Sequence, residues 1–352
     1  MNAALDKKTF RSDLLAWYRA SARALPWRAK PSLYKTVVSE FMLQQTQVKT
    51  ALPYFERWIR ELPGFDALAT APEARVLKLW EGLGYYSRAR NLHKLALAIT
   101  ARPEPPRAPA AWLELPGVGP YTAAAITSIS FGEPVACVDG NVVRILARLT
   151  ADGTVFRDSS SAAKYFTPIA NALVNKAAPG DHNQAMMELG ATICTRQNPS
   201  CAICPVRSSC AGARTLSPEQ FPRLAAKKTE EQSVCRIWFL STKRDAVLLH
   251  RASPSARRLA GIFELPSPAD IELDEKDLTT KNAKLVAEQK RSITRYRITE
   301  KFLALTPGAP LRRRIDARIK TSAGMLQWIA LSDLDKITLS GPHRRIVQKH
   351  FA

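Results

Sequence analysis

Four cysteines within a stretch of 17 residues restrict the folding of this chain more than any other feature. Cys194, Cys201, Cys204 and Cys210 stand in the run CTRQNPSCAICPVRSSC, with the spacing C-x6-C-x2-C-x5-C. Four thiolates this close in sequence can ligate one metal centre, which would fold residues 194–210 into a compact loop. Zinc also binds four cysteines, but its sites usually show two C-x2-C pairs separated by a longer loop. Disulfides fit less well because nothing else in the sequence indicates secretion, and four unrelated thiols fit least.

The chain is strongly basic. Its 352 residues include 52 Lys and Arg against 31 Asp and Glu, a formal net charge of +21, and 46% of the residues are hydrophobic. That hydrophobic share is typical of a folded protein rather than a disordered one. Such an excess of positive charge attracts polyanions, and nucleic acid is the favoured partner. The alternative is a basic surface that only aids solubility.

The hydrophobic pattern changes near residue 212. Before it, apolar residues recur at helical spacing, as in the runs 10–20, 33–59 and 73–84. After it, short apolar and aromatic runs predict strands, at 234–242, 246–251, 296–306 and 325–332. We therefore expect three parts, namely a mainly α N-terminal domain at 1–212, a polar, proline-punctuated linker at 213–232 and a smaller α+β domain at 233–352, which a helix closes.

The run LPGVGPYTAAAITSIS predicts a helix–turn–helix junction. Gly117 and Gly119 flank Val118 in the turn and allow tight backbone geometry and close approach of a ligand. The second helix is expected to start at Pro120, where free backbone N–H groups can bind a phosphate. The alternative is an ordinary tight turn. If the turn anchors DNA phosphates, binding there is expected to show no sequence preference.

Two carboxylates stand in contrasting surroundings. Glu40 lies in the apolar helical run VVSEFMLQQT, where desolvation would raise its pKa and keep a proton available near neutral pH. Asp139, in VDGNVVRILARL, stands at the expected N-cap of a helix, where backbone N–H groups favour the anion. Enzymes that cleave glycosidic bonds usually use two carboxyl groups in such contrasting surroundings. Alone, Asp139 could be only a helix cap and Glu40 could point to solvent.

Several longer strings give these features a family resemblance. They are ALPWR at 24–28, VVSEFMLQQTQV at 37–48, GLGYYSRARNLHKLA at 82–96, LPGVGPYTAAAI at 115–126, VDGNVVRILARL at 138–149 and HNQAMMELGATIC at 182–194. Together with the cysteine loop, they resemble the adenine DNA glycosylases of the MutY type, in the endonuclease III superfamily. The resemblance implies a two-lobed helix-hairpin-helix domain, a [4Fe-4S] cluster on the four cysteines, and double-stranded DNA bound between the lobes.

The resemblance also implies roles for individual residues. Glu40 would protonate a flipped adenine, and Asp139 would stabilise the oxocarbenium-like sugar with support from Asn141 and Tyr121. Because Tyr121 occupies the position where the endonuclease III branch has a lysine, no Schiff base would form. The enzyme would then be monofunctional and leave an abasic site.

The resemblance implies roles for further residues, and for several of them the sequence also allows an ordinary structural role. Glu188 would bind the adenine edge, or be an exposed helix carboxylate. Leu43 and Gln45 would enter the base stack beside the lesion pair, or pack as ordinary helix residues. The resemblance assigns pocket lining to Trp27 and Arg28 and contact with the DNA backbone to Tyr86 and Arg88, although Tyr86 could equally pack in the core.

The second domain resembles Nudix hydrolases, in which RRLAGIFELP at 257–266 matches a family segment. No R-E-x-x-E-E run is present, so pyrophosphate hydrolysis is not expected, and the domain would inspect 8-oxoguanine opposite the adenine. The family's F-S-H recognition loop is not matched, because RSITRYRIT stands there. Ser292 or Thr294 could offer a hydroxyl, and a plain basic strand is the equal alternative.

The expected function is excision of adenine mispaired with 8-oxoguanine or guanine. One alternative is a superfamily glycosylase acting on thymine or oxidised pyrimidines. The other is a non-catalytic iron–sulfur DNA-binding redox sensor. We expect a monomer with no membrane association, in the cytoplasm and associated with the nucleoid.

Overall fold

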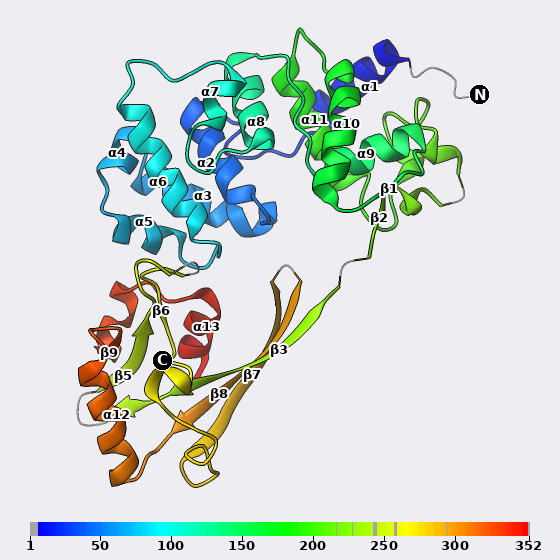
Figure 1. Cartoon of the computed structure of the whole chain (residues 1–352). Coiled ribbons are helices and arrows are strands. Elements are labelled where there is room, and N and C mark those ends of the chain that lie inside the picture. The colour runs from blue at the N-terminus through cyan, green and yellow to red at the C-terminus, as the bar shows by residue number, and fades with distance from the viewer. Residues whose placement is uncertain are drawn as a thin grey trace. The chain divides into compact units, whose positions relative to one another are not determined.

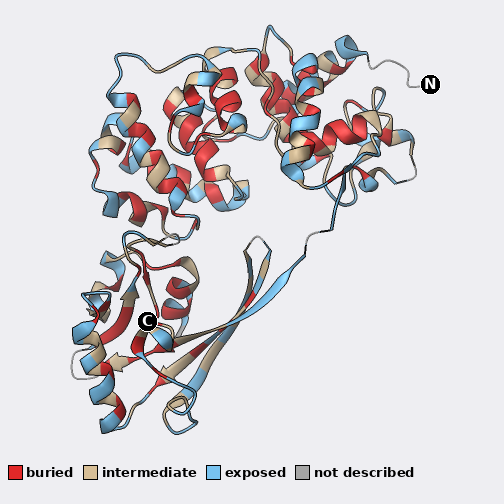
Figure 2. Cartoon of the chain, viewed as in Figure 1, coloured by how far each residue is buried: buried red, intermediate tan, exposed pale blue. Residues whose placement is uncertain are grey.

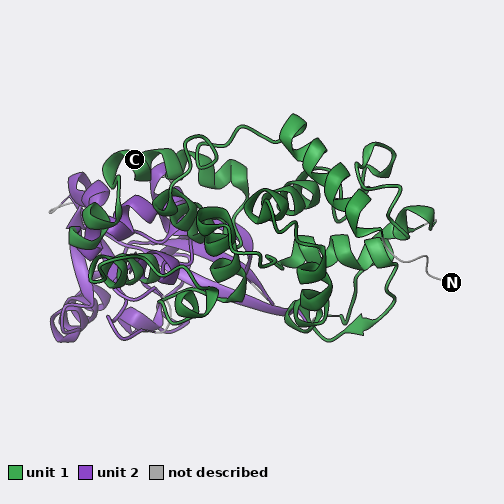
Figure 3. Ribbon diagram, turned by 90° about the horizontal axis from the view of Figure 1, so that it is seen from above, with its two compact units in different colours: residues 1–70, 91–226 green, residues 71–90, 227–352 purple. Residues whose placement is uncertain are grey.

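The computed structural model divides the chain into two compact units (Figure 3). Unit 1 comprises residues 1–70 and 91–226, and unit 2 comprises residues 71–90 and 227–352. The structure describes residues 6–215, 217–226, 228–241, 245–256, 259–293 and 295–350. Among these residues, no helix is long and apolar enough to cross a membrane.

Unit 1 is helical (Figure 1). Its helices are α1 (Lys7–Ser21), α2 (Leu33–Leu43), α3 (Val48–Glu61), α4 (Phe65–Thr70), most of α6 (Ser87–Thr100), α7 (Pro109–Leu113), α8 (Pro120–Phe131), α9 (Gly140–Thr150), α10 (Ser159–Leu173) and α11 (Pro179–Thr192). Two short strands, β1 (Val155–Phe156) and β2 (Arg223–Leu224), pair in parallel. The expected helical structure is confirmed for this part of the chain, although unit 1 leaves out residues 71–90 and extends past the expected bound at 212 to residue 226. The glycine turn lies between α7 and α8.

Local sequence explains where the central helices begin and what they bury. Ser32 caps α2 by accepting from the Lys35 N–H, and Asp158 with Ser161 forms a capping box at the start of α10. Eight of the eleven residues of α2 are buried, including Glu40. A second core joins α1, α9, α10 and α11, where the side chains of Phe10 and Phe166 are fully buried. Buried residues, in red, recur along these helices in Figure 2. The helices that carry the candidate site are therefore held by two hydrophobic cores.

Unit 2 contains two sheets and three α-helices among its described residues. The first sheet has the order β3 (Glu230–Trp238), β8 (Tyr296–Leu305), β7 (Ala283–Ile293), with β3 parallel and β7 antiparallel to β8. In the second sheet, β5 (Ala246–Arg251) pairs with β9 (Leu326–Ala330), β4 (Leu240–Ser241) and β6 (Phe263–Glu264). The helices are α5 (Glu73–Trp80), α12 (Ala309–Thr321) and α13 (Gly341–His350).

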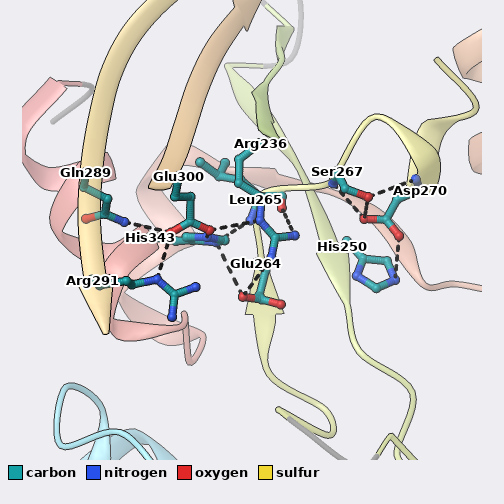
Figure 4. Close-up of polar contacts among 10 residues, drawn as sticks. All are labelled: Arg236, His250, Glu264, Leu265, Ser267, Asp270, Gln289, Arg291, Glu300 and His343. Atoms are coloured by element: carbon teal, nitrogen blue, oxygen red, sulfur yellow. Dashed lines mark hydrogen bonds and ion pairs between the residues drawn. The ribbon is translucent and has the colours of Figure 1, made fainter. Parts of the chain in front are cut away.

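A buried polar network connects the two sheets and α13 (Figure 4). Glu300 is fully buried and accepts hydrogen bonds from Arg236 (3.2 Å), Gln289 (2.9 Å) and Arg291 (3.2 Å). His343 lies 3.2 Å from the same carboxylate through Nε2, while its Nδ1 accepts from the Leu265 N–H. These partners hold the pKa of Glu300 well below its usual range, although burial alone would raise it. Through Leu265, which directly follows β6, the network ties β3, β7, β8 and α13 to the second sheet.

Candidate active site

Asp139 caps helix α9 with its side chain. Its Oδ1 accepts from the N–H groups of Asn141 (2.9 Å) and Val142 (2.8 Å), and its Oδ2 accepts from the Asn141 side-chain amide (3.0 Å). Each oxygen thus has at least one partner, so the carboxylate is held in a fixed direction at the positive end of the helix dipole. The structure therefore brings Asp139 and Asn141 together, as the sequence predicted.

Glu40 lies on α2 in the core and is 6% exposed. Burial raises its pKa to about 7, the charge of Asp139 acts in the same direction, and a hydrogen bond from Tyr121 partly opposes the shift. The hydroxyl of Tyr121, in the first turn of α8, also lies 3.4 Å from the Met187 sulfur. The structure thus groups Glu40, Tyr121 and Asp139 in one site and holds a protonatable carboxyl near an anchored carboxylate.

Glu188 is not an exposed helix carboxylate, because it is 1% exposed on α11. Arg23 contacts both of its oxygens, at 2.6 and 3.0 Å, and Arg28 donates to it at 2.9 Å. These hydrogen bonds lower the pKa of Glu188 against the opposing effect of burial. Arg28 also bonds Gln184 at 3.2 Å and lies over the Tyr18 ring. Sequence reasoning missed Arg23, whose only signal was its place just before ALPWR.

The other residues predicted to contact the substrate, Trp27, Leu43 and Gln45, differ in their exposure to solvent. Trp27 is 9% exposed and stacks edge-on against Phe55 at 5.1 Å between ring centroids. Leu43 is the half-buried last residue of α2, and Gln45 is exposed in the loop that follows, with a left-handed φ of 54°. Gln45 is thus presented to solvent, whereas Trp27 belongs to the core.

The glycine turn between α7 and α8 uses its two glycines differently. Gly117 has a φ of +77°, and a Cβ there would lie 2.6 Å from Asn91 Cβ and 2.9 Å from Phe41 Cε1. Gly119 is the N-cap of α8 with extended backbone, and nothing lies within 4 Å of a Cβ placed there. Val118 between them is buried. Gly117 is therefore required by the fold, while Gly119 keeps open the space before the free N–H groups of the helix.

Tyr86 and Arg88, predicted to contact DNA, point into unit 2 and need correction. Tyr86 is 3% exposed and donates its hydroxyl to the Leu339 carbonyl at 3.0 Å. Arg88 is 6% exposed, bonds the carbonyls of Leu83 and Gly84, and lies over the Trp80 ring. Burial lowers the pKa of Arg88 to about 10. For Tyr86 the structure shows the core alternative that the sequence left open, and for Arg88 it shows a buried position that the sequence did not predict.

Ser292 lies near the tip of the β7–β8 hairpin. It is exposed and pairs in register with Arg297. Thr294, its companion in the prediction, lies outside the described residues, as do Arg257 and Arg258 of the 257–266 segment. The described residues of the predicted recognition segment thus lie in the paired ends of β7 and β8, and this placement agrees with both a recognition loop and a plain basic strand.

The four cysteines line one cavity of about 30 Å³ beside α9 and α11. All four are free and partly buried. Among the residues that the structure describes, no three or more His, Cys, Asp or Glu side chains form a group able to hold a metal ion. The same four thiols nevertheless line a common cavity.

Two arginines of α9 connect the cysteine loop to the site, and sequence reasoning missed both. Arg144 donates to the Cys194 carbonyl and to the Asn141 side chain, each at 2.8 Å. Arg148 is 2% exposed and bonds the Thr195 carbonyl (2.7 Å), the Arg196 carbonyl (3.0 Å) and the Cys194 sulfur (3.4 Å). The loop and the Asp139 cap therefore share one hydrogen-bonded helix.

Comparisons with known proteins place this geometry among DNA repair proteins. The model of the HhH-GPD superfamily base excision DNA repair proteins matches residues 38–169. The adenine DNA glycosylase of Rattus norvegicus is 45% identical over 275 residues, which cover 75% of this chain and 52% of that protein. The adenine DNA glycosylase of Buchnera aphidicola subsp. Acyrthosiphon pisum (strain APS) is 36% identical over 250 residues, 68% of this chain and 69% of that protein.

A solved structure shows a similar fold. A thermostable thymine-DNA glycosylase superposes with a TM-score of 0.51 and 27% identity, covering 58% of this chain and 95% of that one. The chain spans about half of the length of the rodent relatives it matches, 49% for Mus musculus and 52% for Rattus norvegicus.

Proposed function

Because the chain belongs to the adenine DNA glycosylases, with an HhH-GPD repair domain, we propose that it removes adenine mispaired with 8-oxoguanine or guanine from duplex DNA. One observation carries the proposal, which is the pairing of Glu40, whose pKa burial raises to about 7, with the anchored carboxylate of Asp139. Two carboxyl groups with opposed environments suit protonation of a leaving group and stabilisation of a cationic sugar.

The proposed mechanism assigns one task to each group. Protonated Glu40 transfers its proton to a ring nitrogen of the flipped adenine, so the base can leave with the electron pair of the glycosidic bond. Asp139 faces the positive charge that develops on the sugar, and Asn141 holds its direction. Water then adds to the cationic sugar and gives up a proton to the Glu40 carboxylate, which completes hydrolysis, restores the acid and leaves an abasic site.

The base-recognition end of the site would be cationic. With the Glu188 carboxylate engaged by Arg23 and Arg28, the two guanidinium groups are fixed and offer their remaining N–H groups to acceptor atoms on the base. Glu188 would then act mainly by holding the arginines.

The reaction is proposed to stop at the abasic site. Tyr121 offers a phenol where strand cleavage would need an amine, and its hydroxyl is engaged with Glu40 and Met187. Efficient borohydride trapping of the protein on its DNA would contradict this part of the proposal.

Double-stranded DNA is the proposed partner, gripped by the glycine turn. The open space before α8 at Gly119 and the unbonded N–H groups of a helix start suit a phosphate. The net charge of +21 supports binding that weakens steeply as salt rises.

We propose that the four cysteines hold a [4Fe-4S] cluster. Four thiols lining one cavity are the donor set that such a cluster takes, one thiolate to each iron. When bound, the cluster would order the loop of residues 194–210, whose Arg196 and Arg207 could then approach phosphate. Cys204→Ser should therefore lose the brown colour and weaken duplex binding, and full affinity without the cluster would contradict the ordering role.

Unit 2 is proposed to be a Nudix-like domain that inspects the base opposite adenine. Its mixed sheet β3–β8–β7, its antiparallel second sheet and its helices support that assignment, and the β7–β8 hairpin tip with Ser292 offers an exposed hydroxyl. The fold likeness to a thymine-DNA glycosylase keeps thymine excision as the second candidate activity.

Single-turnover assays on defined duplexes would test these assignments. Adenine would be placed opposite 8-oxoguanine, guanine or thymine, with a thymine–guanine duplex alongside, and each reaction would be analysed with and without hot alkali. Cutting only after alkali, fastest for adenine opposite 8-oxoguanine, is the expected result. Absence of cutting at every adenine pair by brown, folded protein would overturn the proposed substrate.

A further inference from the structure

The loop that leads to Asp139 is held by side chains instead of regular secondary structure. Residues 132–139, between α8 and α9, belong to neither helix nor strand, so their backbone polar groups need other partners. Asn183 of α11 accepts a hydrogen bond from the Cys137 N–H (3.0 Å) and donates one to the Val135 carbonyl (2.8 Å). A single buried amide thus grips the loop on both sides of Ala136.

A third bond fixes the orientation of this amide. Asn183 Nδ2 also donates to Ser128 Oγ at 2.8 Å, and both residues are 2% exposed. Turning the amide over would place its NH2 group against the Cys137 N–H and its oxygen against the Val135 carbonyl, two repulsive pairs. The amide therefore has one satisfactory orientation, which it imposes on the loop.

The helices that carry the amide and its acceptor are in backbone contact. A Cβ at Gly180 would lie 2.9 Å from both Ile129 Cα and the Ser128 carbonyl oxygen, so the first turn of α11 packs directly against α8. Tyr121 and Glu188 stand on these same two helices. The loop before Asp139 is therefore held by the same two helices that carry Tyr121 and Glu188.

We propose that Asn183 is a positioning residue for Asp139. The N–H groups of α9 hold the Asp139 carboxylate from its C-terminal side, and Asn183 fixes the backbone two residues before it. Together they would set the direction from which the carboxylate faces the reacting sugar. This inference rests on the proposed glycosylase function, and no contact between Asn183 and the base or sugar is part of it.

Asn183→Ala leaves the buried Cys137 N–H and the partly buried Val135 carbonyl without their partner. We expect single-turnover adenine release to slow by about 10- to 100-fold, as the loss of these two bonds would imply. Affinity for a duplex carrying a non-cleavable adenine analogue should stay within about 3-fold, because the DNA-gripping turn is untouched.

The chain offers a matched control on the same loop. Asn171 of α10 accepts from the Ala136 N–H at 2.9 Å in an exposed position. Water can replace this bond, so Asn171→Ala should change the rate by less than about 2-fold. Phe166→Leu, in the fully buried core beside α9, supplies a destabilised variant without any change at the loop. Equal slowing of Phe166→Leu and Asn183→Ala at equal loss of thermal stability would overturn the positioning role.

Ser128→Ala keeps the inference testable if Asn183→Ala does not fold. It removes the acceptor that orients the amide, together with the hydroxyl's weaker bond to the Ala125 carbonyl (3.4 Å). We expect release to slow by about 3-fold with affinity unchanged. The inference is wrong if the wild-type protein releases adenine and Asn183→Ala releases it at the same rate. Where Asn183→Ala does not fold, a wild-type rate for Ser128→Ala overturns the inference instead. A wild-type protein that releases no adenine refutes the proposed function instead.

Discussion

Glu40 links the proposed chemistry to the stability of the fold. Its carboxyl is placed in the core, and burial raises its pKa to about 7. Glu40→Gln keeps the shape and removes the transferable proton, so adenine release should fall on the order of 10²–10⁴-fold while duplex affinity is retained. Single-turnover rates and binding measured on the same protein preparations would check this, and a rate near wild type would exclude Glu40 as the acid.

The same shift predicts how stability varies with pH. Since the folded-state pKa of Glu40 lies above its unfolded value near 4.5, its stabilising contribution is fully present below that value and is lost as pH rises through about 7. At pH 8, the free energy of unfolding of Glu40→Gln in urea should therefore exceed that of wild type by up to about 3 kcal/mol. Near pH 4.5 the two proteins should be equally stable. The opposite ordering at pH 8 would show that the carboxyl is not desolvated.

The activity should follow the same titration. If protonated Glu40 is the acid, the single-turnover rate should decline as pH rises through about 7. A rate that stays constant from pH 6 to pH 9 would require another proton donor.

At the scale of elements, the two glycines of the α7–α8 turn have different proposed roles. Gly117 is needed for folding, and Gly119 for binding DNA. Gly117→Ala should destabilise the protein by about 1–3 kcal/mol, because it strains a left-handed backbone and meets Asn91 and Phe41. Gly119→Val should leave the melting temperature nearly unchanged, since its Cβ meets no neighbour, yet weaken duplex binding. Thermal melts beside binding at low salt would separate the two effects, and equal melting temperatures for the two variants would contradict this division.

Sequence reasoning succeeded where a residue's partners are local. The Asp139 cap depends on N–H groups two and three residues away, and the α8 start depends on Pro120, so both were predictable. Glu188 meets Arg23 from 165 residues away, and Tyr86 meets the Leu339 carbonyl from 253 residues away, and no local pattern encodes either contact. Strand β7 was missed because its exposed, charged residues along AKLVAEQKRSI lack a regular apolar alternation.

At the scale of the whole molecule, residues 71–90 are part of the unit formed by the C-terminal third of the chain. Lys78 bonds the Ile337 carbonyl at 2.9 Å, and Arg344 pairs with Glu81. A chain ending at Ala226 should therefore melt at lower temperature than the full protein, because Tyr86 and Glu81 lose buried partners. Differential scanning calorimetry would test this, and an unchanged transition for the truncated chain would show that these contacts contribute nothing.

The discontinuous composition of unit 2 also decides how the gene could be recombined. A chimera joined in the segment 213–232 would combine α13 from one parent with α5 from another, although the pair Glu81 and Arg344 spans them. Exchange of unit 2 between relatives should therefore succeed only when residues 71–90 are exchanged together with residues 227–352. Unit 2 therefore cannot be separated from the rest of the chain by cutting the sequence at one position.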